Sequence, residues 1–266
     1  MPARVITLLT DFGTQDAYVG IMKGVILCIN PAARIVDLTH AVRPQDVRTA
    51  ALVLRRAVPF FPPDTIHVVV VDPGVGSARR PLLIETEHGM LLGPDNGVLA
   101  PAASVLQRRV IRDIQNEHYF RHPVSHTFHG RDIFAPVAAH LARGVAAADL
   151  GPAVDAMVEL ALPTPRCTPT AVAGEVVLVD RFGNLITNLD ADTLARFPAQ
   201  EVSVSIGGSR VAGLVSAYAA VGEGMPLAIV GSWDVLEIAV RNGSAAEMFA
   251  AGPGTPVSVV LEPRQT

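Results

Sequence analysis

The sequence predicts an α/β fold: an N-terminal α/β domain with a largely parallel central sheet, followed by a smaller C-terminal all-β domain that resembles a barrel. Three observations support this expectation. Strand-like and helix-like segments alternate over the first two-thirds of the chain. Three prolines then fall within seven residues, from Pro163 to Pro169. Beyond them, short strand-like runs are separated by glycine-rich turns. We therefore expect domains at residues 1–163 and 171–266, joined by a stiff linker at 164–170.

Residue periodicity places the elements of the first domain in order. Val5–Thr10 is an apolar, β-branched run, and Ile66–Val71 is the clearest central strand because turn residues bound it on both sides. Asp16–Ile29 has apolar residues at helical spacing and is ended by Asn30-Pro31. The other expected elements are a strand at Ile35–Leu38, a helix at Pro44–Ala57, a hairpin of Leu82–Thr86 with Met90–Leu92, and a helix at Phe134–Ala142.

The second domain is predicted to be an all-β module, a small barrel or sandwich, because each apolar run there is short and ends in a turn. The expected strands are Glu175–Val179, Leu185–Asn188, Val202–Ile206, Leu227–Val230, Glu237–Val240 and Val257–Leu261.

Composition excludes several classes of function. The 21 basic and 25 acidic residues give a net charge of −4, which argues against a general nucleic-acid binder. Lys23 is the only lysine, and its surroundings fit neither a Walker-type phosphate loop nor the site of a Schiff-base enzyme. The longest uncharged apolar stretch, Val211–Val221, is far too short to span a membrane. The N-terminal apolar run is too short for a signal peptide, so we expect a soluble cytoplasmic protein.

Metal and cofactor sites are not expected. Cys28 and Cys167 lie far apart in the sequence, so a cysteine-based zinc or iron–sulfur site is excluded. A run of histidines has spacings that would suit a helical metal site, but Pro123 interrupts the helix and the segment is typical of a loop. These histidines are His118, His122, His126 and His129.

Two aspartates follow predicted strands of the first domain. Asp11 comes after the first strand and Asp72 after the central one, and ligands of open α/β sheets bind at such strand ends. A carboxylate there can accept hydrogen bonds from a ribose diol, although Asp11 could instead cap a helix and Asp72 could cap its own Asp-Pro-Gly turn. Arg79 lies seven residues after Asp72 and can fold back onto it. His129 sits in a glycine-containing connection, which suggests a position at the rim of a site.

Two residues of the second domain could recognise a nucleoside. Phe182 can stack on a purine, and Asn184 can both donate to and accept from the edge of the base. The same Gly-Asn segment also fits a plain hairpin turn, so the local pattern leaves both interpretations open.

Six motifs in order, spread from about residue 5 to 262, resemble the S-adenosyl-L-methionine (SAM) hydrolase family, also called SAM hydroxide adenosyltransferases. This family is related to the SAM-dependent fluorinase and chlorinase. The motifs are Thr10-Asp11-Phe12-Gly13 with Asp16, Val71-Asp72-Pro73-Gly74-Val75-Gly76 with Arg79, Gly93-Pro94-Asp95-Asn96-Gly97, Thr127-Phe128-His129-Gly130-Arg131-Asp132, Asp180-Arg181-Phe182-Gly183-Asn184 and Leu236-Glu237-Ile238-Ala239.

The resemblance implies the conversion of SAM and water to adenosine and L-methionine, with SAM as substrate and no cofactor. It also implies a homotrimer whose site lies at a subunit interface, between the large domain of one chain and the small domain of a neighbour. The residues it implies are Asp11 for the ribose hydroxyls, Asp72, Arg79 and His129 for the water, Phe128 and Phe182 beside the nucleoside, Asn184 and Tyr218 for the adenine, and Asp180, Ser232 and Glu237 near the methionine. The sequence leaves open whether Asp72 or His129 accepts the proton from water.

Two other functions remain possible at this stage. A halogenase of the same fold would use chloride or fluoride as the nucleophile, but the halogenases carry tyrosine where Asp72 and His129 stand, and a carboxylate at the nucleophile site repels halide. The long hairpin insertion of the fluorinase is also missing between Ile84 and Gly93. A non-catalytic SAM or adenosine sensor would share the binding motifs, but it would not need the complete set of Asp72, Arg79 and His129.

Overall fold

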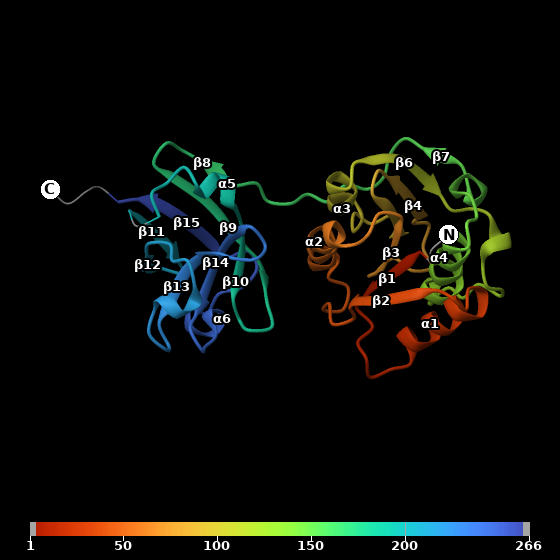
Figure 1. The fold of residues 1–266 in the computed structure, drawn as a ribbon, viewed down its shortest axis with the longest axis horizontal. Helices are drawn as coiled ribbons and strands as arrows, with labels where there is room; N and C mark the ends of the chain where they lie inside the picture. The colour runs from red at the N-terminus through yellow and green to blue at the C-terminus, as the bar shows by residue number, and fades with distance from the viewer. Residues whose placement is uncertain (1–3, 200, 263–266) are drawn as a thin grey trace. The chain divides into compact units, whose positions relative to one another are not determined.

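The computed structural model describes residues 4–199 and 201–262, and the chain divides into two compact units. Unit 1 runs to Leu160 and unit 2 begins at Ala161 (Figure 1). Unit 1 combines a seven-stranded sheet with helices, whereas unit 2 is built mainly of strands.

The sheet of unit 1 has the strand order β2-β1-β3-β5-β4-β6-β7. Pairing is parallel from β2 through β1 and β3 to β5, and antiparallel from β5 through β4 and β6 to β7. The α/β class predicted from the sequence is therefore confirmed, with the parallel pairing in one half of the sheet. The strands are β1 (Val5–Thr10), β2 (Arg34–Thr39), β3 (Thr65–Val70), β4 (Pro81–Thr86), β5 (Gly89–Pro94), β6 (Arg108–Asp113) and β7 (Ala153–Val154).

The helices of unit 1 cover both faces of its sheet. They are α1 (Tyr18–Ile29), α2 (Val47–Ala57), α3 (Ala100–Val105), α4 (Ala135–Ala142), a π-helix at Gly130–Phe134 that leads into α4, and 3₁₀ turns at Val58–Phe60, Glu117–Tyr119 and Ala147–Leu150. The helix predicted from Pro44 begins only at Val47, because the Asp46 side chain caps it by accepting a hydrogen bond of 2.9 Å from the backbone N–H of Thr49.

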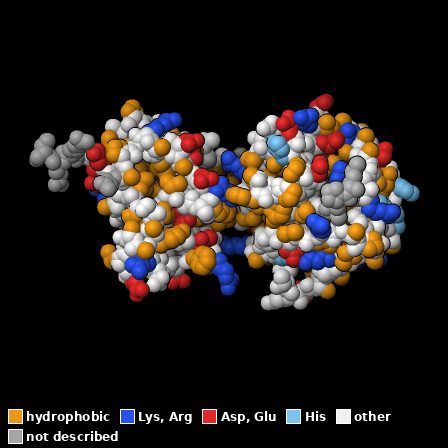
Figure 2. Space-filling model, in the orientation of Figure 1, with side chains coloured by type: hydrophobic (Ala, Val, Ile, Leu, Met, Phe, Trp, Pro, Cys, Tyr) orange, Lys and Arg blue, Asp and Glu red, His pale blue; other side chains and the backbone are white. Residues whose placement is uncertain are grey.

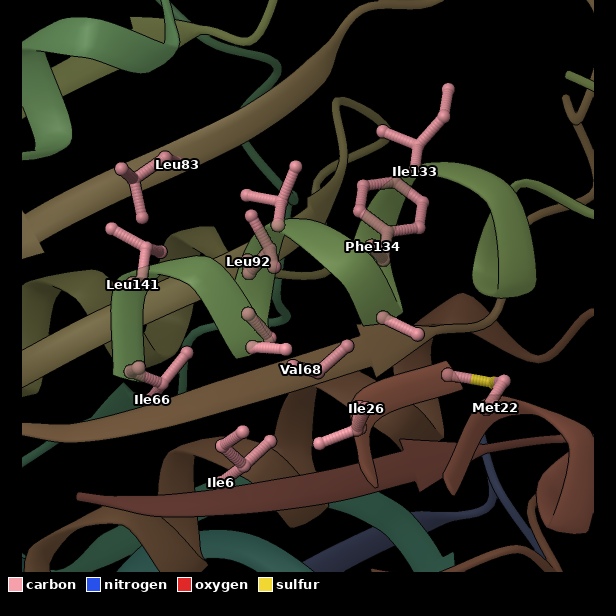
Figure 3. Packing of buried hydrophobic residues seen from close by; sticks show 14 of the residues in the cluster. Ile6, Met22, Ile26, Ile66, Val68, Leu83, Leu92, Ile133, Phe134 and Leu141 are labelled. Atoms are coloured by element: carbon pink, nitrogen blue, oxygen red, sulfur yellow. The ribbon is translucent and has the colours of Figure 1, made fainter. Parts of the chain in front are cut away.

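Alternate side chains of the central strands divide the core of unit 1 into two layers. On one face, Ile6 of β1 and Val68 of β3 pack against Met22 of α1 and Phe134, which precedes α4 (Figure 3). On the other face, strand residues such as Val69 pack against α2 and α3. This two-sided burial explains why β1 and β3 have nearly continuous apolar sequences, and it fixes the strand ends from which the loops of the site extend.

The strands of unit 2 form a nearly closed antiparallel sheet. The order is β12-β11-β15-β9-β10-β14-β13, with β8 paired to β9. Its two edges approach each other where Val215, after β12, donates a backbone hydrogen bond of 2.9 Å to the carbonyl of Ala228 in β13. The elements are β8 (Arg166–Cys167), β9 (Ala171–Val179), β10 (Leu185–Asp190), α5 (Ala191–Leu194), β11 (Val202–Ile206), β12 (Ser209–Ala212), a 3₁₀ turn (Tyr218–Ala220), β13 (Pro226–Val230), β14 (Val235–Val240), α6 (Ala245–Met248) and β15 (Pro256–Leu261).

The surface of each unit is chemically mixed. On the face that Figure 2 shows, acidic and basic side chains are interspersed with apolar ones, as is usual for folded domains. Within the described part of the chain, no helix combines the length and the apolar character needed to cross a bilayer.

Candidate active site

A cavity of about 310 Å³ lies in unit 1 where the parallel strands β1 and β3 end. Thr10 and Val70 are paired neighbours in these strands, so Asp11 and Asp72 follow them at the same edge of the sheet. The residues that line the cavity are Asp11, Phe12, Pro44, Gln45, Val70, Asp72, Pro73, Val75, Thr127, Phe128, His129 and Gly130. Its volume is within the range of small-molecule binding sites.

The segment after β3 doubles back to bring Arg79 onto Asp72. Two successive turns, in which Val75 and Ser77 donate to the carbonyls of Asp72 and Gly74, reverse the chain. Gly76 is required here, because its φ is +76° and a Cβ would lie 2.3 Å from the carbonyl oxygen of His126. The sequence predicted this return of Arg79 from its spacing alone.

Arg79 holds Asp72 and His129 together. Its Nε lies 3.0 Å from each carboxylate oxygen of Asp72, and its Nη2 also donates to Oδ2. The same Nη2 lies 2.6 Å from Nδ1 of His129. The side chains of Arg79 and Asp72 are only 9% and 4% exposed, so the pair is shielded from solvent. The three residues that the sequence assigned to the water do form one cluster.

The hydrogen bond from Arg79 determines which nitrogen of His129 carries a proton. A guanidinium can only donate, so Nδ1 of His129 accepts, and the proton of the neutral ring is on Nε2. Burial lowers the pKa of His129, and the adjacent positive charge of Arg79 lowers it further. The ring is therefore neutral at neutral pH and presents Nε2–H as a donor.

A π-helix and a buried aspartate position His129. The π-helix at Gly130–Phe134 begins directly after it, and such turns are frequent at functional sites. Asp132, which is fully buried, accepts from Nε and Nη2 of Arg131, both at 2.7 Å, and from the backbone N–H of Ser125 at 2.9 Å. These bonds tie the ends of the loop that carries His129 to each other.

The rings of Phe12 and Phe128 form one wall of the cavity. Phe12, Tyr18 and Phe128 contact one another, with ring centroids 5.2–5.8 Å apart, and Arg131 lies over the ring of Phe128. The family resemblance implied Phe128 beside the nucleoside but did not identify Phe12. The position of Phe12, next to Asp11 in the first motif, was the signal that could have identified it.

The carboxylate of Asp11 is held by a backbone group from another segment of the chain. Its Oδ2 accepts a hydrogen bond of 2.7 Å from the backbone N–H of Gln45, a residue with φ of +69°. The segment after β2 thus contributes to the orientation of Asp11, which could not be inferred from the sequence.

In unit 2, Asp180 organises the turn that precedes β10. Its Oδ1 accepts from the backbone N–H groups of Phe182 and Asn184, and its Oδ2 accepts from the side-chain amide of Asn184 at 2.9 Å. Asn184 is buried, whereas Phe182 is 76% exposed. The hairpin-turn interpretation of this segment is therefore right, and the turn leaves an aromatic side chain in solvent.

Tyr218 and Glu237 form a second pair in unit 2. The hydroxyl of Tyr218 donates to Oε1 of Glu237 at 2.5 Å, and this hydrogen bond, with burial, raises the pKa of Tyr218 to about 12. Burial raises the pKa of Glu237, and the charge of Asp180 adds to the rise while the bond from Tyr218 opposes it. Asp180 is thus close enough to act electrostatically on both. Ser232 is exposed in the turn between β13 and β14.

Among the described residues, no group of three or more His, Cys, Asp or Glu side chains is arranged to hold a metal ion. His118 and His140 instead contact the ring of Tyr119, with centroids 5.2 and 5.1 Å apart.

Known proteins are similar to this chain over most of its length. Models of the N-terminal and C-terminal domains of SAM hydroxide adenosyltransferases match residues 6–151 and 174–258. The chain belongs to the SAM hydroxide adenosyltransferase family. A Salinispora tropica protein named (R)-S-adenosyl-L-methionine hydrolase is 40% identical over 261 residues, which cover 97% of this chain and 98% of that protein.

Two further relatives extend this comparison. A fluorinase from an Actinoplanes species is 27% identical over 226 residues, covering 74% of this chain and 76% of that enzyme. A crystal structure of an uncharacterized conserved protein from Thermotoga maritima has a TM-score of 0.91 and 39% identity, and covers 96% of this chain and 99% of that one. The resemblance inferred from the motifs is confirmed.

Proposed function

We propose that this enzyme hydrolyses SAM to adenosine and L-methionine. The oxygen of water attacks the 5′ carbon of the ribose, and the bond from that carbon to sulfur breaks. Its electron pair goes to sulfur, which leaves as the neutral thioether of methionine, and one water proton is released. The leaving group needs no acid, so the site has to align and activate a water molecule.

The observation that carries this proposal is the cluster of Asp72, Arg79 and His129 at the cavity. Asp72 and His129 line the cavity, and Arg79 bridges them. Its Nη1 is buried without a hydrogen-bond partner among the described residues, so it is a donor that the oxygen of water or hydroxide would satisfy. Holding the water in line with the 5′ carbon contributes part of the rate, and the shielded charge of Arg79 stabilises the developing hydroxide.

The hydrogen bonds favour Asp72 over His129 as the proton acceptor. The lone pair of Nδ1 in His129 is occupied by Arg79, and its Nε2 carries a proton. The carboxylate oxygens of Asp72 retain further lone pairs after binding Arg79. In this mechanism Asp72 accepts the proton, and Nε2–H of His129 donates to the water oxygen and holds it.

The nucleoside would bind beside the same cluster. Asp11 accepts from the ribose hydroxyls, and Phe128 contacts the nucleoside. In unit 2, donation from Asn184 to Asp180 fixes the amide, so its Oδ1 remains to accept from the adenine amine. Phe182 stacks on the base and Tyr218 lines the pocket for it, while Asp180, Ser232 and Glu237 serve the methionine part.

We also propose that the enzyme is a cytoplasmic homotrimer, as the family resemblance implies. In this proposal, the cavity of unit 1 in one copy is completed by unit 2 of a neighbouring copy. The high exposure of Phe182, together with that of Tyr218 at 45%, supports a role for both side chains in contacts outside their own unit.

The test is to incubate the enzyme with SAM in the absence of halide and then with chloride or fluoride. The proposal predicts adenosine and methionine in equal amounts in every case. A 5′-halo-adenosine as the main product would make the protein a halogenase. Tight binding of SAM without any conversion over hours would make it a sensor.

A further inference from the structure

A buried histidine outside the cavity links the loop that carries Asp11 to the next strand. His40 directly follows β2, the neighbour of β1, and it is only 7% exposed. Its Nδ1 lies 2.9 Å from Oγ1 of Thr10, and its carbonyl oxygen accepts from the backbone N–H of Gly13 at 2.8 Å. His40 therefore contacts the chain on both sides of Asp11.

Between Phe12, Thr10, His40 and Asp37, each group directs its proton toward the next one. Nε2 of His40 lies 3.1 Å from Oδ1 of Asp37, an ion-pair distance at a less than ideal hydrogen-bond angle. A carboxylate there favours the proton on Nε2, which leaves Nδ1 to accept from the hydroxyl of Thr10. Oγ1 of Thr10 in turn accepts from the backbone N–H of Phe12 at 3.2 Å. Thr10 thus both accepts from Phe12 and donates to His40, while Nε2 of His40 faces the carboxylate of Asp37 at ion-pair distance without a hydrogen bond.

At the end of this series of contacts that is farthest from Asp11, the only lysine of the protein binds Asp37. Nζ of Lys23, in α1, lies 2.6 Å from Oδ2 of Asp37. Although burial opposes it, the hydrogen bond from Lys23 and the close contact with His40 keep the pKa of Asp37 below its ordinary value. Asp37 is therefore charged at neutral pH, and it anchors the imidazole of His40.

The segment that starts at His40 also reaches the carboxylate itself. Five residues later, the backbone N–H of Gln45 donates to Oδ2 of Asp11. The orientation of Asp11 thus depends on the register between the loop after β1 and the loop after β2, and the contacts of His40 with Thr10 and Gly13 set that register.

We propose that Thr10, His40, Asp37 and Lys23 form a relay of positioning residues that aims the carboxylate of Asp11 at the ribose diol. This inference rests on the proposed function, because it assumes that Asp11 binds the diol. None of the four side chains has to touch the substrate. Their removal should therefore weaken recognition of the two hydroxyls more than binding of the rest of the nucleoside.

The experiment compares adenosine with 2′,3′-dideoxyadenosine by calorimetry. The proteins are the wild type, Asp11→Asn, Thr10→Val, His40→Leu and the conservative Thr10→Ser. Thr10→Val removes the hydroxyl at nearly constant volume, and Thr10→Ser keeps it. The relay predicts that Thr10→Val and His40→Leu weaken adenosine binding roughly tenfold, the effect of about one hydrogen bond to a charged group. Both should bind the dideoxy compound within about twofold of wild type, and Thr10→Ser should retain the preference for adenosine.

Asp37→Asn, whose side chain is 40% exposed, tests the relay at a site where folding is less at risk. It should lose a smaller part of the preference for the diol. The relay is overturned if Thr10→Val, His40→Leu and Asp37→Asn all keep the full preference, or if they lose affinity for both ligands equally. If wild type and Asp11→Asn bind the two ligands alike, the assigned role of Asp11 is wrong and the relay falls with it. If wild type prefers adenosine, Asp11→Asn loses that preference and the relay variants keep it, then the relay is wrong and the role of Asp11 stands.

Discussion

At the scale of single residues, Arg79 is the centre of the site. Each proton of its Nη2 has a distinct acceptor, one on Asp72 and one on His129, while Nε bonds both oxygens of the carboxylate. A lysine could not make these contacts at once, because an ammonium lacks the planar fork. The spacing of seven residues predicted the pair with Asp72, but the contact with His129 depends on a loop fifty residues away.

Asp72→Asn should lower kcat by about 10²–10⁴ and leave KM within a few fold, because the proton acceptor acts on the reaction path. Arg79→Lys should recover only part of the activity that Arg79→Met loses. The matched control is Arg80→Lys, since Arg80 pairs with Asp95 and not with the cluster. Steady-state kinetics with SAM measure all four. If Asp72→Asn kept the kcat of the wild type, Asp72 would have no role in the chemistry.

The pH dependence of the rate should report the protonation of His129. Burial and Arg79 lower its pKa below 6.5, so the active neutral ring persists through neutral pH and is lost as the pH falls through that lowered pKa. The loss of kcat/KM that comes from protonation of His129 should therefore occur below pH 6.5, and this contribution should be absent in His129→Asn. Because His129 donates and does not accept the proton, the defect of His129→Asn should persist up to pH 9. A defect that disappears with rising pH would make His129 the base.

At the scale of elements, the central strand β3 contains a buried titratable group unrelated to catalysis. His67 is 1% exposed, contacts Oγ1 of Thr7 at 2.9 Å and packs against the ring of Phe61. Burial lowers the pKa of His67 to about 4. The unfolded chain binds a proton there near pH 6.5, so the free energy of unfolding should fall as the pH drops from about 6.5 to about 4.

The expected loss from His67 is about 3 kcal/mol over that range, as an order of magnitude. Urea unfolding at several pH values should show a flatter dependence in His67→Asn, whose amide can still bond Thr7 but does not titrate. This variant should be less stable than wild type at neutral pH, because the amide fills the site less well. Equal slopes for the two proteins between pH 4.5 and 6.5 would show that His67 does not titrate on unfolding.

The sequence predicted those elements that form a continuous apolar run or have a clear helical period. β1 and β3 are apolar on both faces, and their spans were predicted within one residue. β6 was missed because its sequence, RRVIRD, is mostly charged. Its charged side chains form ion pairs, such as that between Arg112 and Glu85. The π-helix at Gly130–Phe134 was also missed, because its widened turn depends on tertiary contacts of the buried Asp132.

At the scale of the whole molecule, family membership followed from six short motifs, whereas the grouping of their residues required the fold. Asp11, Asp72 and His129 come from three separated segments that only the strand order of unit 1 brings to one cavity. The relay through His40 had no sequence signal, since a lone histidine after a strand is usually a packing residue.

If the site is shared between copies of the chain, catalysis should depend on assembly. Light scattering and activity measured on the same dilution series should fall together as trimers dissociate, because each cavity would lose residues of its neighbour. A Phe182→Ala variant that remains trimeric should lose affinity for adenosine, since it removes a stacking surface. A fully active monomer at assay concentration would contradict the shared site.

The central claim, attack of water on the 5′ carbon of SAM, is tested most directly by one turnover experiment in ¹⁸O-labelled water. Mass spectrometry of the products should find one labelled oxygen in adenosine, at its 5′ hydroxyl, and none in methionine. In the same time Asp72→Asn should form far less adenosine, but the adenosine that does form should carry the same label. Label in methionine, or adenosine formed without label, would contradict this mechanism.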